Sequence, residues 1–203
     1  MPSTFPSLFD PQKATQALNF LARKAGGRIN RMKALKLLYF ADRYHLRKYG
    51  RLITKDDYFA MYHGPVPSGT KDISEFSNVV SEKDEKYASR YIATVERYDI
   101  RSVESPDLEV FSDSDIEALD FTWNNFGHLD QFALADLTHK YPEWQKHQHS
   151  LQDESTKRVD MVIEDFLNDP VDDVNRCYDL DAEEREALRE ELKETAEIER
   201  LLG

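Results

Sequence analysis

Residues 31–50 read RMKALKLLYFADRYHLRKYG, and no other segment says as much about the fold. Alanine, leucine and tyrosine side chains recur there at helical spacing and form one broad apolar face. Asn30 precedes the segment as an N-cap, and Gly50 is a stop signal at its end. We therefore predict a long helix over residues 30–49 that packs its apolar face into the core.

Similar signals place further elements along the chain. Helices are predicted at residues 11–25, near 70–80, 112–126, 131–140, 154–167 and 181–202. Strands are predicted at residues 57–62 and in the segments RYIATVERYDI (residues 90–100) and LEVF (residues 108–111). We expect a mainly α fold with a small antiparallel β-sheet (α+β), namely a compact helical domain of about five to seven helices plus a sheet of about two to three strands.

The charge of the chain is concentrated at one end. The sequence has 203 residues and a net charge of −12, and residues 151–203 carry 18 acidic against 7 basic side chains. The remaining 21 acids and 20 bases make residues 1–150 nearly neutral. We therefore predict a domain over residues 1–150 and an acidic helical C-terminal extension over residues 151–203. This balance disfavours generic binding to nucleic acid or to anionic lipid.

Composition indicates a cytoplasmic location. Charged residues make up 33% of the chain, and no apolar run approaches the roughly 20 residues of a membrane span. The N-terminal residues carry neither a basic start nor an apolar segment, so no signal peptide is expected. The single cysteine, Cys177, is expected to be a half-exposed free thiol, which suits a reducing compartment.

The predicted helix at residues 30–49 also has a basic face. Residues 28–51 contain eight basic residues and one acid. The candidate partner-facing charges on this face are Lys33, Lys36, Arg43 and Arg47. Three roles fit them: a solvated face, a docking strip for the acidic extension of the same chain, and a surface for an external partner.

Asp42 and His45 stand three residues apart on one face of the same helix, and His63 leaves the neighbouring strand. These residues suit either an acid/base dyad or a hydrogen-bonded cluster that fixes the helix against the strand. The sequence places no nucleophile, metal set or oxyanion motif beside them, so we favour the structural role.

The segment YHGPVPSGTK, residues 62–71, imitates a phosphate-binding loop. Such a loop needs consecutive backbone N–H donors, and Pro65 and Pro67 have none. We expect instead a tight turn in which Gly64 adopts a positive φ. His139 and Glu143, with His147 and His149, suggest metal binding only weakly, since Pro142 interrupts their helix. No metal and no cofactor are expected.

Three blocks of the sequence resemble the motifs of a known protein family. They are LKLLYFADRYHLRKYGRLIT (residues 35–54), YFAMYHGPV (residues 58–66) and FGHLDQFALADLTHKYPEW (residues 126–144). In this order they resemble the Panacea domain, also called the SocA-like antitoxin or phage-associated GepA-like family, over about residues 12–148. The residues that match its motifs or lie beside them, as structural or partner-binding candidates, are Tyr39, Phe40, Asp42, His45, Tyr62, His63, Gly64, Pro65, Thr138, His139 and Trp144.

The resemblance implies a non-enzymatic antitoxin of a bacterial or phage toxin–antitoxin system. Its partner would be a cognate protein toxin, encoded by an adjacent gene and neutralised by direct binding. Two alternatives are a proteolytic adaptor that delivers the toxin to a bacterial protease and, less favoured, an enzyme that uses Asp42, His45 and His63. The acidic extension would either compete for a basic surface on the toxin or merely keep the protein soluble.

Overall fold

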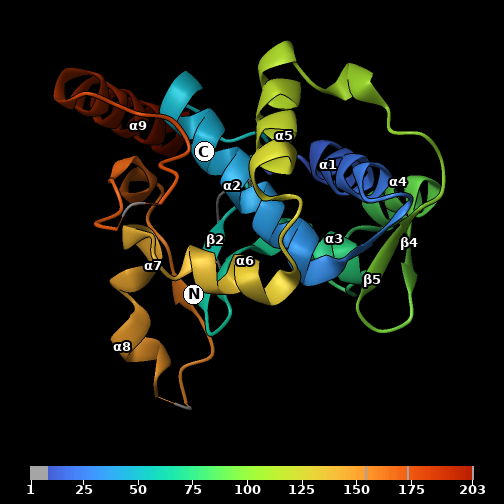
Figure 1. The fold of residues 1–203 in the computed structure, drawn as a ribbon. Helices are drawn as coiled ribbons and strands as arrows, with labels where there is room; N and C mark the ends of the chain where they lie inside the picture. Colours follow the sequence, from blue (N-terminus) through green and yellow to red (C-terminus); the bar gives the residue numbers. More distant parts are fainter. Residues whose placement is uncertain (1–8, 154, 173, 203) are drawn as a thin grey trace.

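The computed structural model describes residues 9–153, 155–172 and 174–202 (Figure 1). In chain order, its elements are α1 (Pro11–Lys24), β1 (Arg28–Asn30), α2 (Arg31–Tyr49), β2 (Tyr58–Met61), β3 (Gly64–Pro67), α3 (Ser68–Glu75), α4 (Glu82–Tyr91), β4 (Ile92–Val95), β5 (Asp99–Ser102), η1 (Leu108–Val110), α5 (Asp113–Phe126), α6 (Gln131–Thr138), α7 (Pro142–Gln145), α8 (Gln148–Leu151), β6 (Val159–Asp160), η2 (Ile163–Leu167) and α9 (Ala182–Leu202).

Helix α2 runs through the middle of the molecule, and other elements surround it (Figure 1). It begins where the Asn30 side chain accepts a hydrogen bond from the Lys33 backbone, and it ends at Gly50, which has a left-handed φ of 72°. Both ends lie where the sequence predicted them. Every residue from Ala34 to Arg47 is buried, so the helix contacts protein on its polar face as well as on its apolar face.

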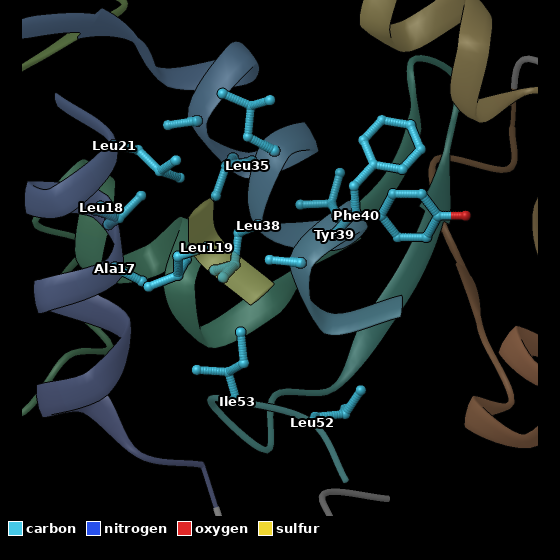
Figure 2. Close-up of a cluster of buried hydrophobic side chains, with 14 of the residues drawn as sticks. Ala17, Leu18, Leu21, Leu35, Leu38, Tyr39, Phe40, Leu52, Ile53 and Leu119 are labelled. Carbon is cyan, nitrogen blue, oxygen red and sulfur yellow. The ribbon is translucent and has the colours of Figure 1, made fainter. Parts of the chain in front are cut away.

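Helices α1 and α5 enclose one side of α2. Figure 2 shows apolar side chains of α1 directed toward Leu35 and Leu38 of α2, with Leu119 of α5 beside them. Burying a leucine contributes about 1.5–3 kcal/mol relative to leaving it exposed, so this cluster is a main source of stability. Asp10 caps α1, and Ser112 and Asp115 form a capping box at the start of α5, at the predicted start of that helix.

Two three-stranded antiparallel sheets flank the helices, in the orders β1-β5-β4 and β3-β2-β6. In the second sheet, Tyr58 lies opposite Pro67 and Met61 lies opposite Gly64. Pro65 and Pro67 are tolerated in β3 because it is an edge strand, where a missing N–H breaks no central ladder. The predicted tight exit after β2 is therefore a β-hairpin.

The α+β class, mostly helical, is confirmed. The described part of the chain contains nine α-helices, more than predicted, because α4 was missed and α7 and α8 have only four residues each. The helix predicted at residues 154–167 is wrong, since that stretch forms β6 along β2 and then the short η2. The LEVF strand is also wrong, because residues 108–110 form a 3-10 turn capped by Asp107.

The C-terminal segment over residues 159–180 is built into the main core. Phe166, Leu167 and Cys177 have no exposed surface, and burial raises the pKa of the Cys177 thiol to about 11. The expectation of a half-exposed thiol is therefore wrong. Helix α9 lies at the edge of the molecule (Figure 1), where Leu188 and Leu192 pack against the core. We therefore propose that the separable extension begins near residue 181, instead of at residue 151.

This division predicts that two truncations behave differently. A chain ending at residue 180 is expected to fold, with a loss of about 1–3 kcal/mol from the contacts of Leu188 and Leu192. A chain ending at residue 150 removes Phe166, Leu167 and β6, so we expect it to lose cooperative unfolding. Urea denaturation followed by circular dichroism measures both. A cooperative transition of wild-type midpoint in the shorter chain would contradict this division.

Candidate binding groove

Three segments distant in sequence meet at Gly64. The ammonium of Lys36, on α2, donates a 2.6 Å hydrogen bond to the carbonyl of Pro65. Gly64 has a φ of +96°, and a Cβ at this position would lie 2.2 Å from Thr138 Oγ1 and 3.1 Å from Lys36 Nζ. Only glycine fits both the backbone conformation and the space, so the contact fixes β3 against α2 and the end of α6.

A second contact fixes the turn of the hairpin. The indole N–H of Trp144 donates to the carbonyl of Met61 at 2.9 Å. The His139 ring stacks on Trp144 with centroids 3.8 Å apart. Burial, with the nearby charge of Lys36, lowers the pKa of His139, so the neutral ring is favoured. The side chains of Tyr62 and His63 are left exposed at the turn.

The exposed turn borders a groove of about 1100 Å³. Its walls come from the start of α2, the β2–β3 hairpin, α3, the β4–β5 turn, the start of α6 and residues 151–153, 156 and 157. Tyr62, Tyr98 and Phe132 belong to this lining and are 71%, 55% and 59% exposed. The two motif contacts thus support one edge of an open surface that carries aromatic side chains.

Two buried arginines near the C-terminal end of α2 form hydrogen bonds with the C-terminal segment. The Arg43 guanidinium, fully buried, binds Glu143 at 2.8 Å and donates to the carbonyls of Asn168 and Arg176, each at 2.5 Å. Arg47 donates to the carbonyls of residues 166–168 and 178, and pairs with Asp169 at 2.6 Å. These two arginines therefore hold the C-terminal segment mainly by its backbone.

The predicted row of partner-facing charges is wrong for three of its members. Lys36, Arg43 and Arg47 are 0–1% exposed, because the hairpin and residues 166–178 cover the polar face of α2. Lys33 is half-buried, and its ammonium donates to the Gly127 carbonyl at 2.6 Å. Of the three roles considered for this face, the contacts of Arg43 and Arg47 match docking of the chain's own C-terminal segment.

The Asp42 and His45 side chains turn to different neighbours. Asp42 accepts hydrogen bonds from the Ile53 backbone at 2.7 Å and from the Tyr58 hydroxyl at 2.8 Å. His45 lies between the Arg51 carbonyl and the side chains that begin α5. The structure does not bring Asp42 and His45 together as a dyad, and both act as buried ties between α2 and its surroundings.

Tyr39 and Phe40 lie in the core. The Tyr39 hydroxyl donates to Glu143 at 2.6 Å, and the Phe40 ring stacks on Phe126 with centroids 4.2 Å apart. Glu143 thus accepts from both Tyr39 and Arg43, a role that the sequence did not reveal. The sequence signal for Glu143 is its position beside the motif residue Trp144, and its need to pair with an arginine follows only once Arg43 is known to be buried.

The backbone donors of the loop resembling a phosphate site are already occupied. The N–H groups of Gly69 and Thr70 donate to the Asp56 carboxylate at 2.8 and 2.7 Å, and the Thr70 hydroxyl adds a third bond. An internal carboxylate therefore takes the place that an anion would fill at the start of α3. Within the described residues, no group of His, Cys, Asp and Glu side chains is arranged to hold a metal ion.

Comparison with models of protein families identifies a family for this chain. The model of the family described as antitoxin SocA-like, Panacea domain, matches residues 35–145, more than half of the chain. This range covers α2 from its second turn on, the β2–β3 hairpin and α6–α7, the elements joined at Gly64 and Trp144. No curated protein and no solved structure matches the chain. In the part of the chain that the structure describes, no helix has the length and apolar character needed to span a membrane.

The contact at Gly64 predicts a costly substitution. Gly64→Ala is expected to lower the free energy of unfolding by about 2–4 kcal/mol, because it adds a clash with Thr138 to the strain of a positive φ. Gly26→Ala is the matched control, since Gly26 has a φ of +85° and nothing within 4 Å of an added Cβ. In a Thr138→Ala background the cost of Gly64→Ala should shrink, as measured by urea denaturation. An equal cost for both glycines would argue against the clash.

Asp42 predicts a specific pH dependence of stability. Burial raises its pKa to about 7, although the bonds from Tyr58 and Ile53 oppose the shift. The folded state then binds the Asp42 proton more tightly than the unfolded state, so this stabilisation is full below about pH 4 and is lost as the pH rises to about 7. Asp42→Asn removes this loss, and its stability relative to wild type should therefore rise between pH 4 and pH 7.

Urea denaturation at several pH values measures this difference, which approaches about 1.4 kcal/mol for each unit of the pKa shift. The exposed neighbour Asp57 supplies the control, Asp57→Asn. A difference between Asp42→Asn and wild type that stays constant over this range would show that Asp42 is ionised throughout.

Proposed function

The chain belongs to the antitoxin SocA-like, Panacea domain family, and from this premise we propose that it neutralises a cognate protein toxin by direct binding. The toxin would be encoded by an adjacent gene. The observation that carries this proposal is the family match over residues 35–145, which covers the buried helix, the hairpin and the contacts that support the groove.

The polar motif residues Asp42 and His45 are hydrogen-bonded within the protein, which favours a binding role over a catalytic one. Asp42 and His45 have their side-chain atoms committed to neighbouring segments. His63 lies at the hairpin turn with an exposed side chain, apart from the Asp42 bonds that tie α2 to β2. Buried, satisfied polar groups of this kind hold a structure in one conformation. A preformed domain with an open groove suits recognition of another protein.

Co-expression with the adjacent open reading frame tests the proposal. Induction of that reading frame alone in a bacterial host is expected to arrest growth, and expression of this chain should restore it. The purified pair should also form a complex on size-exclusion chromatography. A harmless neighbour, or one that arrests growth whether or not this chain is present, would refute the proposal.

The toxin level in the rescued cells separates direct neutralisation from the adaptor mechanism. Direct binding leaves the toxin present but inactive, whereas an adaptor that delivers it to a protease depletes it. An immunoblot of the tagged toxin after rescue distinguishes the two. A toxin level that falls with this chain and recovers when the host protease is deleted would replace direct neutralisation by the adaptor role.

A further inference from the structure

We propose that the groove beside the β2–β3 hairpin is the toxin-binding surface, and that it takes an acidic segment of the toxin that carries a large apolar side chain. This inference rests on the proposed function and adds to it the surface and the chemistry of the segment recognised. It is carried by exposed aromatic side chains, by the local charge and by the rigidity of the hairpin.

The aromatic side chains are the first argument. Tyr62, Tyr98 and Phe132 come from three separate parts of the chain, yet all line one groove with more than half of each side chain exposed. Leu35 and Val66, both buried, extend this apolar surface inward. Aromatic residues beside an apolar hollow are the side chains that dominate protein–protein binding energies. The groove therefore suits an apolar side chain of a bound segment, which the aromatic residues of the groove would contact.

Charge is the second argument. The groove is lined by four basic side chains and two acidic ones, although the whole chain has a net charge of −12. Glu75 is shared by Arg31 at 3.4 Å and Lys71 at 2.7 Å, whereas Lys157 makes no ion pair within the described residues. A locally basic groove attracts an acidic segment, whereas two whole copies of this chain, each with a net charge of −12, repel one another.

Lys36 lies at the inner wall of the groove, where burial works against its charged form. It is 1% exposed, and its ammonium bonds to a backbone carbonyl, with no carboxylate paired to it in the described chain. Burial lowers the pKa of Lys36 to about 7, because nothing nearby compensates the charged form. A carboxylate brought close by a bound segment would stabilise that charge.

Rigidity is the third argument. Trp144, on which His139 stacks, bonds to the Met61 carbonyl at the turn that presents Tyr62, and Gly64 fixes the following strand against Thr138. The groove edge therefore has little conformational freedom to lose on binding. A preorganised edge retains more of its contact energy as affinity.

Substitution of exposed aromatic residues tests the inference without disturbing the core. The probe is the purified protein encoded by the adjacent open reading frame, titrated by isothermal calorimetry. Tyr62→Ser and Phe132→Ser are each expected to weaken binding about tenfold or more, the scale of a hot-spot residue. Val171→Ser, at a position 92% exposed and outside the groove, should bind as wild type.

Charge reversal tests the acidic character of the bound segment. Lys157→Glu is expected to weaken binding about three- to tenfold at low salt and less at high salt, because its contribution is electrostatic. Lys86→Glu makes the same change at an exposed position on α4, outside the groove, and should have little effect. Equal effects of the two reversals would show that only the net charge matters, which contradicts the inference.

The outcomes separate this inference from the proposed function. If wild type binds and neutralises the probe and the Tyr62→Ser/Phe132→Ser double variant does so equally well, the groove assignment falls while the antitoxin role stands. If wild type neither binds nor neutralises it, the proposed function itself fails. If wild type is a dimer by light scattering and Phe132→Ser makes it a monomer, a second copy occupies the groove and the inference is overturned.

Discussion

Helix α2 is buried from Ala34 to Arg47 while it carries lysine, aspartate, histidine and arginine side chains, and this constrains every segment around it. An unpaired charge in a protein interior costs several kcal/mol, so each of these groups needs a partner from elsewhere in the chain. The β2–β3 hairpin supplies a carbonyl to Lys36, α7 supplies Glu143, and the C-terminal segment supplies carbonyls to Arg43 and Arg47. The placement of these three segments follows from the polar groups of one helix.

Helix ends were the most predictable part of the fold, because each depends on a few neighbouring residues. Asn30 caps α2 and Gly50 ends it, as expected, and Asp10, Ser112 and Asp130 cap the helices predicted to begin beside them. Elements that depend on distant partners were predicted less well. The two-residue β6 forms because it pairs with β2. The residues around β6 in the sequence give no sign of this distant pairing.

The same limit explains what was missed at the groove and at the basic face. Helical spacing shows that Lys36, Arg43 and Arg47 share a side of α2, but it does not show whether water or protein lies against that side. Tyr98 and Phe132 give no sequence signal of their role, since they reach the groove only after the β4–β5 turn and α6 are placed. The motif residues form the scaffold that positions the groove. Its exposed rim becomes evident only from the three-dimensional structure.

The hydrogen bonds between α2 and the C-terminal segment also affect how the protein folds during its synthesis on the ribosome. Arg43 binds the carbonyl of Arg176, 133 positions further along the chain, and Arg47 binds that of Tyr178, 131 positions further. At about 5–20 residues per second, the ribosome needs roughly 7–26 s to make the intervening chain, and throughout that time the arginines lack these acceptors. A nascent chain therefore cannot complete the burial of its central helix until residues 176–178 have been made, so the core is finished only after their synthesis.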